Sequence, residues 1–314
     1  MKTFPLQYGL KLEDGVFWNL NFSPDLITWG REFGKILGLK EDTQNHQHQM
    51  FFYSGEEEYL QSHIYGDFLN RGSNKCKLAS YFFPGLQIRY HSSSGIYHCI
   101  LPEMNKENPK MRFVSMISAL FPIYREAMNS GGLVLHAALL YHPNIDGIAI
   151  LAPSGTGKST CAWRIPQPWS AYCDDLILVV RKPPSKYYVH PLPTWSNFYS
   201  SRSSAPIWPI EQYTDLHGLF FLQKAENDKV IPLPKPDSVQ WIYESSMQIY
   251  KEFIYCMSKE EQLNQKNIIF SNACQLAREC QSFILKSTFH GCFWVEIERI
   301  FEMNNVYPLS EIQG

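Results

Sequence analysis

The chain has 314 residues, 45% of them hydrophobic, which is enough to bury a sizeable core and to form two domains. Its formal charge of −2 excludes a general attraction to nucleic acid or to an anionic membrane. No apolar run reaches the roughly 18 residues that span a bilayer, no apolar signal-peptide core is present, and the eight cysteines lack metal-ligand spacing, so we expect a reduced, cytoplasmic protein.

The residues up to about 128 predict an N-terminal α+β domain. A hairpin over residues 5–22 turns at Asp14-Gly15, a dipeptide typical of tight turns between strands. A helix over residues 23–39 follows, with Ser23 as its N-cap and a proline at its first position.

The N-terminal domain then continues with short strands and one long helix. The helix covers residues 109–132, is kinked at Pro122 and ends at two glycines. Strands precede it at residues 49–54, 86–93 and 95–101. The aromatic residues of these strands suit the capture of an extended peptide by strand addition, and a scaffold that mediates self-association is the alternative.

Residues 129–314 predict a second, α/β domain with a mixed sheet, because strands alternate with flanking helices. Strands are expected at 133–142, 148–152, 170–173 and 176–180, as a pair at 216–224 and 229–233, and at 290–297. Helices are expected at 158–165, 236–253 and 259–283.

A phosphate-binding loop occupies residues 152–159, which read Ala-Pro-Ser-Gly-Thr-Gly-Lys-Ser between an apolar strand and a helix. Gly155 and Gly157 can adopt backbone angles closed to other residues, so successive N–H groups can turn inward around an anion. Lys158 would reach the β- and γ-phosphates of a nucleotide, and the Ser159 hydroxyl would ligate Mg²⁺. The expected nucleotide-binding residues are Ala152, Pro153, Ser154, Gly155, Thr156, Gly157, Lys158, Ser159 and Thr160.

Two adjacent carboxylates, Asp174 and Asp175, follow the loop at the end of a short expected strand. One turn of chain through a brief helix would bring them back beside the loop. One carboxylate can hold Mg²⁺ while the other accepts a proton from an attacking hydroxyl. A structural Asp-Asp turn between two strands is the alternative.

The stretch from His136 through the loop to Asp174-Asp175 resembles the catalytic domain of HPr kinase/phosphorylase, over about residues 130–182. That family has a histidine on the strand before its phosphate loop and a double aspartate at this separation, and it shares its fold with phosphoenolpyruvate carboxykinase. The resemblance implies that Asp174 is the base for a serine hydroxyl, while Asp175 assists and joins Ser159 on Mg²⁺. His136 would then orient a phosphate, although on the residues alone a core side chain on an apolar strand is the better interpretation.

The overall layout resembles the kinase-like proteins of peptide-modifying gene cassettes, such as the SynChlorMet cassette protein, in which an unrelated N-terminal domain precedes this core. We therefore expect ATP- and Mg²⁺-dependent transfer of the γ-phosphoryl group to a serine of a small protein or precursor peptide. A small-molecule kinase and a nucleotide-dependent peptide-binding protein without kinase activity are the alternatives. We expect no nucleic-acid or membrane partner, and we leave homo-oligomer formation open.

Two weaker signals carry less weight. Arg202 lies in a polar and aromatic loop at 190–204, where it could meet the γ-phosphate or simply remain solvated. His46 and His48 lie on one side of an extended segment, but no further ligands are evident, so we favour a surface loop over a metal site.

Overall fold

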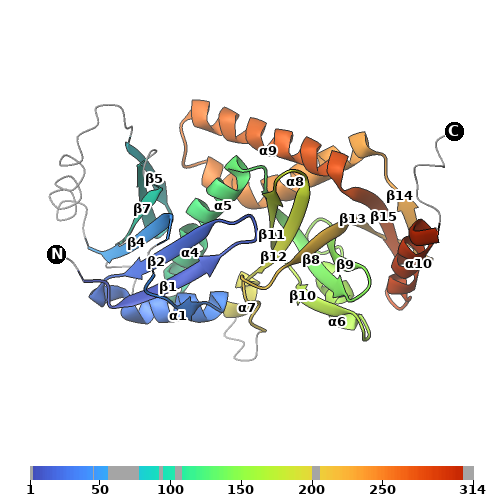
Figure 1. Ribbon diagram of the computed structural model, residues 1–314, viewed down its shortest axis with the longest axis horizontal. Coiled ribbons are helices and arrows are strands. Elements are labelled where there is room, and N and C mark those ends of the chain that lie inside the picture. The colour runs from blue at the N-terminus through green and yellow to red at the C-terminus, as the bar shows by residue number, and fades with distance from the viewer. Residues whose placement is uncertain are drawn as a thin grey trace. The chain divides into compact units, whose positions relative to one another are not determined.

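The computed structural model describes residues 3–44, 46–55, 78–91, 95–102, 108–199 and 206–306. These residues form two compact units (Figure 1). The first unit comprises Met1–Glu126, Pro193–Glu211 and Glu252–Gln262, and the second comprises Ala127–Leu192, Gln212–Lys251 and Leu263–Gly314. Each unit contains a β-sheet with associated helices, so the predicted α/β class is confirmed. The division into domains at residue 128 stays a prediction.

A seven-stranded sheet forms the centre of the first unit, in the order β3-β1-β2-β4-β7-β6-β5. β4 pairs in parallel with both of its neighbours, β2 and β7. All other pairs of this sheet are antiparallel. The strands are β1 (Leu6–Lys11), β2 (Phe17–Phe22), β3 (Lys40–Glu41), β4 (His48–Ser54), β5 (Leu78–Phe83), β6 (Leu86–His91) and β7 (Ile96–Leu101). The predicted hairpin is confirmed as the β1–β2 pair, and Gly15 has a positive φ of 90° in its turn.

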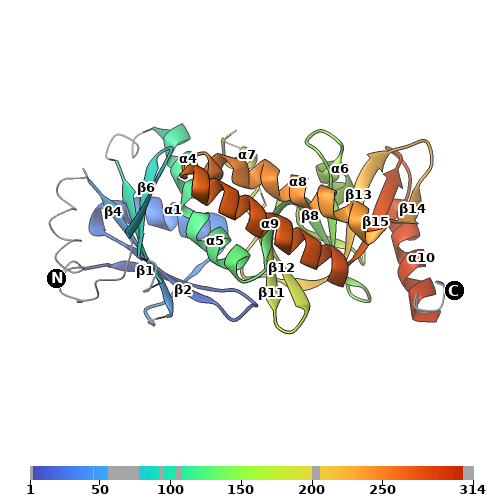
Figure 2. The ribbon, with the colours of Figure 1, turned by 90° about the horizontal axis from the view of Figure 1, so that it is seen from above.

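One face of this sheet is covered by α1 (Ile27–Leu37), α4 (Pro109–Ala119) and α5 (Phe121–Asn129) (Figure 2). An aromatic core joins α1 to the strands, since Trp29 contacts both Phe22 and Phe52. Ser23 occupies the N-cap position of a 3₁₀ turn (Pro24–Leu26) that leads into α1, with proline at the first position as predicted, but its side chain makes no capping hydrogen bond. The Ser23 N–H instead donates to the Phe52 carbonyl, which ties the residue to β4.

The long helix expected over residues 109–132 is two helices. α4 ends at Ala119 and α5 begins at Phe121, which makes Pro122 the second residue of a new helix rather than a kink inside one. Proline is tolerated in the first turn because its missing N–H has no intrahelical partner there.

An eight-stranded mixed sheet forms the second unit, in the order β10-β8-β11-β12-β13-β15-β14, with β9 paired to both β8 and β13. The strands are β8 (Leu133–His142), β9 (Asp146–Leu151), β10 (Ser170–Cys173), β11 (Leu176–Lys182), β12 (Lys186–Leu192), β13 (Thr214–Lys224), β14 (Lys229–Pro232) and β15 (Gln281–Ser287). The helices of this unit and its connections are α6 (Lys158–Arg164), α7 (Trp195–Tyr199), α8 (Lys235–Ile254), α9 (Lys259–Glu279) and α10 (Phe293–Val306).

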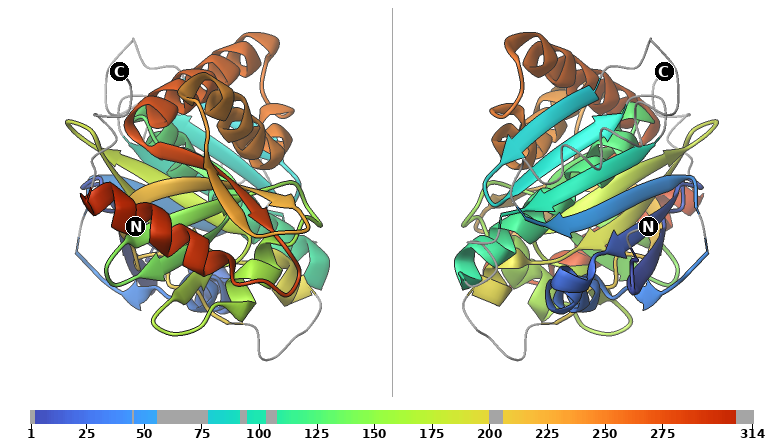
Figure 3. Two further views of the ribbon diagram at one scale, coloured as in Figure 1. Left: turned by 90° about the vertical axis from the view of Figure 1, so that its right-hand side faces the viewer. Right: turned by 90° about the vertical axis from the view of Figure 1, so that its left-hand side faces the viewer.

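Helices cover both faces of this second sheet: α8 and α9 lie on one side of the strands, and α10 lies on the other (Figure 3). The α10 side has a continuous apolar core in which Phe220, Phe283 and Phe293 are buried. No helix in the described part of the chain is long and apolar enough to cross a membrane.

Three predictions for the second unit are wrong. β13 and β14 do not pair with each other, because β15 lies between them, parallel to β13 and antiparallel to β14. The predicted helix over 259–283 ends at Glu279, and the strand expected at 290–297 is the start of α10. Burial explains α10: Phe293, Ile297 and Phe301 recur every four residues and enter one core, which is helical spacing.

Candidate functional site

β8 changes partners next to His136, and this change brings the predicted site residues together. β11 pairs with β8 as far as His136, and β10 pairs with β8 from Leu139 onward. Asp174 and Asp175 join these two strands, so both carboxylates lie where the pairing passes from β11 to β10. On its other side β8 pairs with β9, whose last residue leads directly into the phosphate loop.

The phosphate loop runs from the end of β9 into α6, as the sequence predicts. Gly155 has φ of 77° and Gly157 has φ of 123°, values that favour glycine. A Cβ atom built on either glycine would meet no other atom within 4 Å. The loop therefore faces open space with the backbone shape of an anion cradle.

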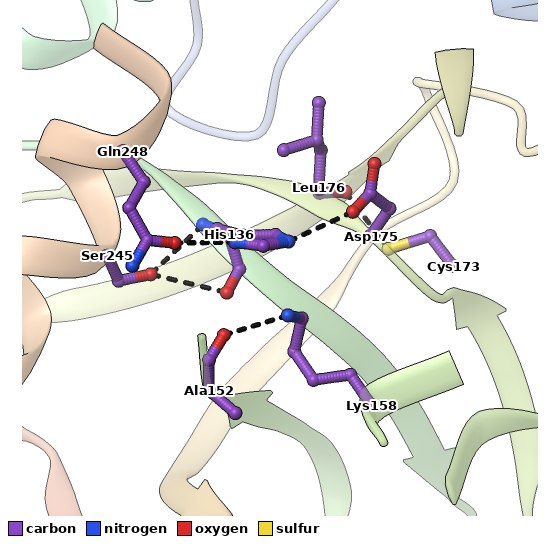
Figure 4. A network of polar contacts seen from close by, with 8 residues as sticks. All are labelled: His136, Ala152, Lys158, Cys173, Asp175, Leu176, Ser245 and Gln248. Carbon is purple, nitrogen blue, oxygen red and sulfur yellow. Dashed lines mark hydrogen bonds and ion pairs between the residues drawn. The ribbon is translucent and has the colours of Figure 1, made fainter. Parts of the chain in front are cut away.

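Lys158 is the first residue of α6, and only 5% of its surface is exposed. Its Nζ atom donates a hydrogen bond of 2.8 Å to the Ala152 carbonyl at the other end of the loop (Figure 4). Burial lowers the pKa of Lys158 below the ordinary lysine value, and the charges of Asp175 and Asp174 oppose that shift. Burying an ammonium group is costly when its charge is not balanced nearby. The hydrogen bond to the Ala152 carbonyl offsets only part of this cost, so a phosphate anion in the loop would stabilise Lys158.

His136 lies between a carboxylate and an amide. Its Nε2 atom is 3.1 Å from Asp175 Oδ1, and its Nδ1 atom is 2.6 Å from Gln248 Oε1 on α8 (Figure 4). Both partner atoms are acceptors in this arrangement, so both contacts are hydrogen bonds when both ring nitrogens carry protons. Rotating the Gln248 amide by 180° would serve the neutral ring equally well.

Ser245, one turn before Gln248, fixes the backbone of the same residue. The His136 N–H donates to Ser245 Oγ at 3.0 Å, and Ser245 Oγ donates to the His136 carbonyl at 3.3 Å. The pairing of β9 with β8 ends at Ala137. The Ser245 hydroxyl therefore provides hydrogen bonds to the N–H and carbonyl of His136, which lie beyond that pairing. α8 thereby determines where His136 stands.

Asp174 is the more buried of the two aspartates, with 5% of its surface exposed. The indole Nε1 of Trp163, on α6, donates to Asp174 Oδ2 at 3.2 Å. The indole ring itself remains 58% exposed. α6, the helix that follows the phosphate loop, therefore also holds the Asp174 carboxylate, which the family resemblance implies as the base.

A family model described as SynChlorMet cassette protein ScmC matches residues 99–302, more than half of the chain. The chain belongs to the ScmC family. The matched region contains β8, the phosphate loop, both aspartates and α8, so every residue of the candidate site lies within it. No protein with a curated description matches the chain.

Sequence reasoning missed four residues of this ScmC-family site. Gln248 and Ser245 lie more than 100 positions after His136 in the sequence. The one sequence feature that could have linked them is their spacing of three residues, which places both on one face of a helix. Trp163 lies on an expected helix without a motif. Lys224, at the end of β13, has its Nζ atom 3.4 Å from the Gly155 carbonyl and adds a second cation beside the loop.

The residues present fit a magnesium nucleotide. Ser159 is exposed in the first turn of α6, and the side chain of Asp175 is 34% exposed, so both can be reached by a cation. The described residues include no cluster of three or more His, Cys, Asp or Glu side chains that could hold a metal by themselves. Mg²⁺ is commonly held by one or two protein ligands together with substrate phosphates and waters, and Ser159 and Asp175 would be those ligands here.

The weaker sequence signals lie elsewhere. Arg202 falls outside the described residues, and the loop expected at 190–204 is in part β12 and α7. His46 contacts Asp42 at 3.0 Å, and His48 lies on β4 with its ring against Trp18. The surface-loop interpretation was therefore wrong for His48, which is a strand residue.

Proposed function

We propose that this ScmC-family chain is an ATP- and Mg²⁺-dependent kinase with an HPr kinase-like catalytic domain. Its acceptor would be a serine hydroxyl of a peptide or small protein encoded in the same kind of cassette. The observation that carries the proposal is that the buried Lys158, the open glycine loop and the Asp174-Asp175 step meet beside His136 on β8.

Mg²⁺·ATP, when bound, supplies the transferable phosphoryl group and neutralises part of its charge. The N–H groups of the loop and the Lys158 ammonium would hold the β- and γ-phosphates. Ser159 and Asp175 would hold the cation. Positioning and charge neutralisation supply most of the rate enhancement in such reactions, so these contacts matter more than covalent chemistry.

Asp174 would take the proton from the acceptor hydroxyl as the new bond between that oxygen and Pγ forms. The bond between Pγ and the bridging oxygen breaks at the same time, and that oxygen leaves on ADP with the electron pair. The Trp163 N–H holds the Asp174 carboxylate in place for this transfer. His136, held by Gln248 and Asp175, would face the transferred phosphoryl group.

The seven cysteines among the described residues are free thiols. Free thiols suit a reducing compartment, so we propose that the kinase works in the cytoplasm.

The test is calorimetry with Mg²⁺·ATP combined with transfer of labelled γ-phosphate to serine peptides encoded beside the gene. Lys158→Ala should weaken ATP binding by at least about tenfold, because it removes the cation that faces the phosphates. Asp174→Asn should abolish transfer and leave ATP binding intact, because an amide cannot accept the proton. Equal ATP affinity in the wild type and in Lys158→Ala would refute the proposal, whereas ATP and peptide binding without transfer would favour the accessory-protein alternative.

A further inference from the structure

A small pocket opens beside the reacting groups at the carboxyl ends of β9 and β13. These strands are parallel, with Leu151 opposite Phe221, so both end at the same edge of the sheet, where ligands commonly bind in such folds. The lining residues include Ala152 and Pro153 of the phosphate loop, Phe221 of β13, and Trp241, Glu244, Ser245 and Gln248 of α8.

Three lining residues connect the pocket directly to the site. The Ala152 carbonyl accepts the hydrogen bond from Lys158, and Gln248 and Ser245 both contact His136. Gln248 approaches His136 from one side of the ring and Asp175 from the other (Figure 4). The pocket therefore adjoins the residues expected at the γ-phosphate, which is where an acceptor must approach.

The chemistry of the walls selects a cation on an apolar stem. Trp241 supplies the aromatic wall, and its ring packs on the fully buried Phe221 with ring centroids 5.5 Å apart. Glu244 is the one charged residue among those that line the pocket, and Gln240 donates to its carboxylate at 2.9 Å, which fixes its direction. An indole ring near a carboxylate attracts an ammonium or guanidinium group, and the indole can cover the methylene groups that carry it.

We propose that this pocket binds a lysine or arginine side chain of the acceptor peptide, close in sequence to the phosphorylated serine. This inference rests on the proposed function, because it assumes that a peptide accepts the phosphoryl group. A cation bound here would also lie near the transferred phosphoryl group and add to the positive charge around it.

The first experiment measures binding without ATP or turnover. The protein carries eight tryptophans, which are labelled with ¹⁵N at the indole nitrogen, and the Trp241 resonance is assigned by its loss in Trp241→Phe. Two serine peptides that differ only in lysine against norleucine are titrated in. We expect the lysine peptide to shift the Trp241 resonance with an affinity about tenfold tighter than the norleucine peptide.

Glu244→Gln should remove that preference, because it keeps the shape of the side chain and deletes its charge. Asp237→Asn is the matched control, since Asp237 is an exposed carboxylate in the first turn of the same helix and does not line the pocket. Equal affinity of both peptides for the wild type, or a preference that survives Glu244→Gln, would overturn the proposal. A Trp241 shift caused by adenosine instead of lysine would also overturn it, because the pocket would then be a base site.

The second experiment measures transfer from ATP to the same peptides. Glu244→Gln should raise KM for the lysine peptide by about tenfold with little change in KM for ATP. Absence of ATP binding would defeat the kinase proposal while the binding experiment still reports on the pocket. Lysine-selective binding in a protein that transfers phosphate equally well to both peptides would defeat the acceptor role of the pocket.

Discussion

At the scale of single residues, the site depends on one buried cation. Lys158 has a lowered pKa because burial disfavours its charged form, and the nearby aspartates only partly offset this. Between that lowered pKa and the ordinary value of 10.5, the unfolded chain binds more protons at this lysine than the folded chain does. The free energy cost of burying Lys158 therefore falls as the pH rises through this window.

The same shift predicts that ATP binding takes up a proton. Phosphate anions favour the charged lysine, so between the lowered pKa and the ordinary value the bound site should hold a proton that the free site lacks, and affinity should fall as the pH rises through this window. Calorimetry in buffers of different ionisation enthalpy measures the uptake. Lys158→Arg is the control, because arginine keeps its charge and should show no uptake at this position. Identical uptake in both proteins would contradict the assignment.

Trp163 gives a second prediction at this scale. Trp163→Phe keeps a large aromatic ring and removes the N–H that donates to Asp174. We expect kcat for phosphoryl transfer to fall about tenfold, since a hydrogen bond to a charged group is lost, while KM for ATP stays the same. Trp294→Phe is the control, because that indole lies over Arg164 and not at Asp174. An equal rise in KM for ATP in Trp163→Phe would indicate a structural role instead.

At the scale of elements, the position of β8 decides whether the site forms. α8 holds the strand at His136 through Ser245 and Gln248. α9 holds the residues that lead into β8, because the buried Asn272 side chain donates hydrogen bonds to the carbonyls of Met128 and Gly132 at 2.7 and 2.9 Å. Two helices far along the chain thus fix the strand that carries the histidine.

Asn272→Ala should lower the free energy of unfolding by about 2 kcal/mol, because two buried carbonyls lose their donor. Urea denaturation followed by circular dichroism measures this. Asn267→Ala, at an exposed position on the same helix, should change the value by less than about 0.5 kcal/mol. Similar losses in both variants would show that helix propensity, and not the two hydrogen bonds, accounts for the effect.

At the scale of the whole molecule, the first unit is built from three separate stretches of chain. Phe253, beyond α8's midpoint, contacts Phe83 and Phe121 within this unit. The Ile210 N–H donates to the Leu37 carbonyl, also within it. A cut near residue 128 therefore does not separate the two units cleanly.

A chain limited to residues 129–314 should consequently expose apolar side chains and associate. Phe253 and Ile254, both buried in the intact protein, would lose the partners that residues 1–128 supply. Light scattering and dye binding at hydrophobic surfaces are the measurements. A monomeric truncated protein that unfolds cooperatively would contradict this expectation. Peptide capture by the N-terminal strands is therefore better tested in the full chain, for example at Phe82 of β5, the last strand in the order of the described sheet, where Phe82 is 61% exposed.

The sequence by itself determined the features that depend on short-range geometry. The Asp14-Gly15 turn, the strand before the phosphate loop and the loop's entry into α6 follow from residues a few positions apart, whose backbone preferences act locally. The placement of the Asp174-Asp175 step beside the loop also followed, because the connecting helix and strand are short.

Only the tertiary structure decided which distant elements meet. The partners Ser245 and Gln248 of His136, and the insertion of β15 between β13 and β14, arise from long-range burial and pairing. The stretch at 293–297 is rich in aromatic and β-branched residues and favours a strand locally. It forms α10 because a spacing of four residues lets Phe293 and Ile297 enter the same core, and burial of apolar surface outweighs the weaker local preference.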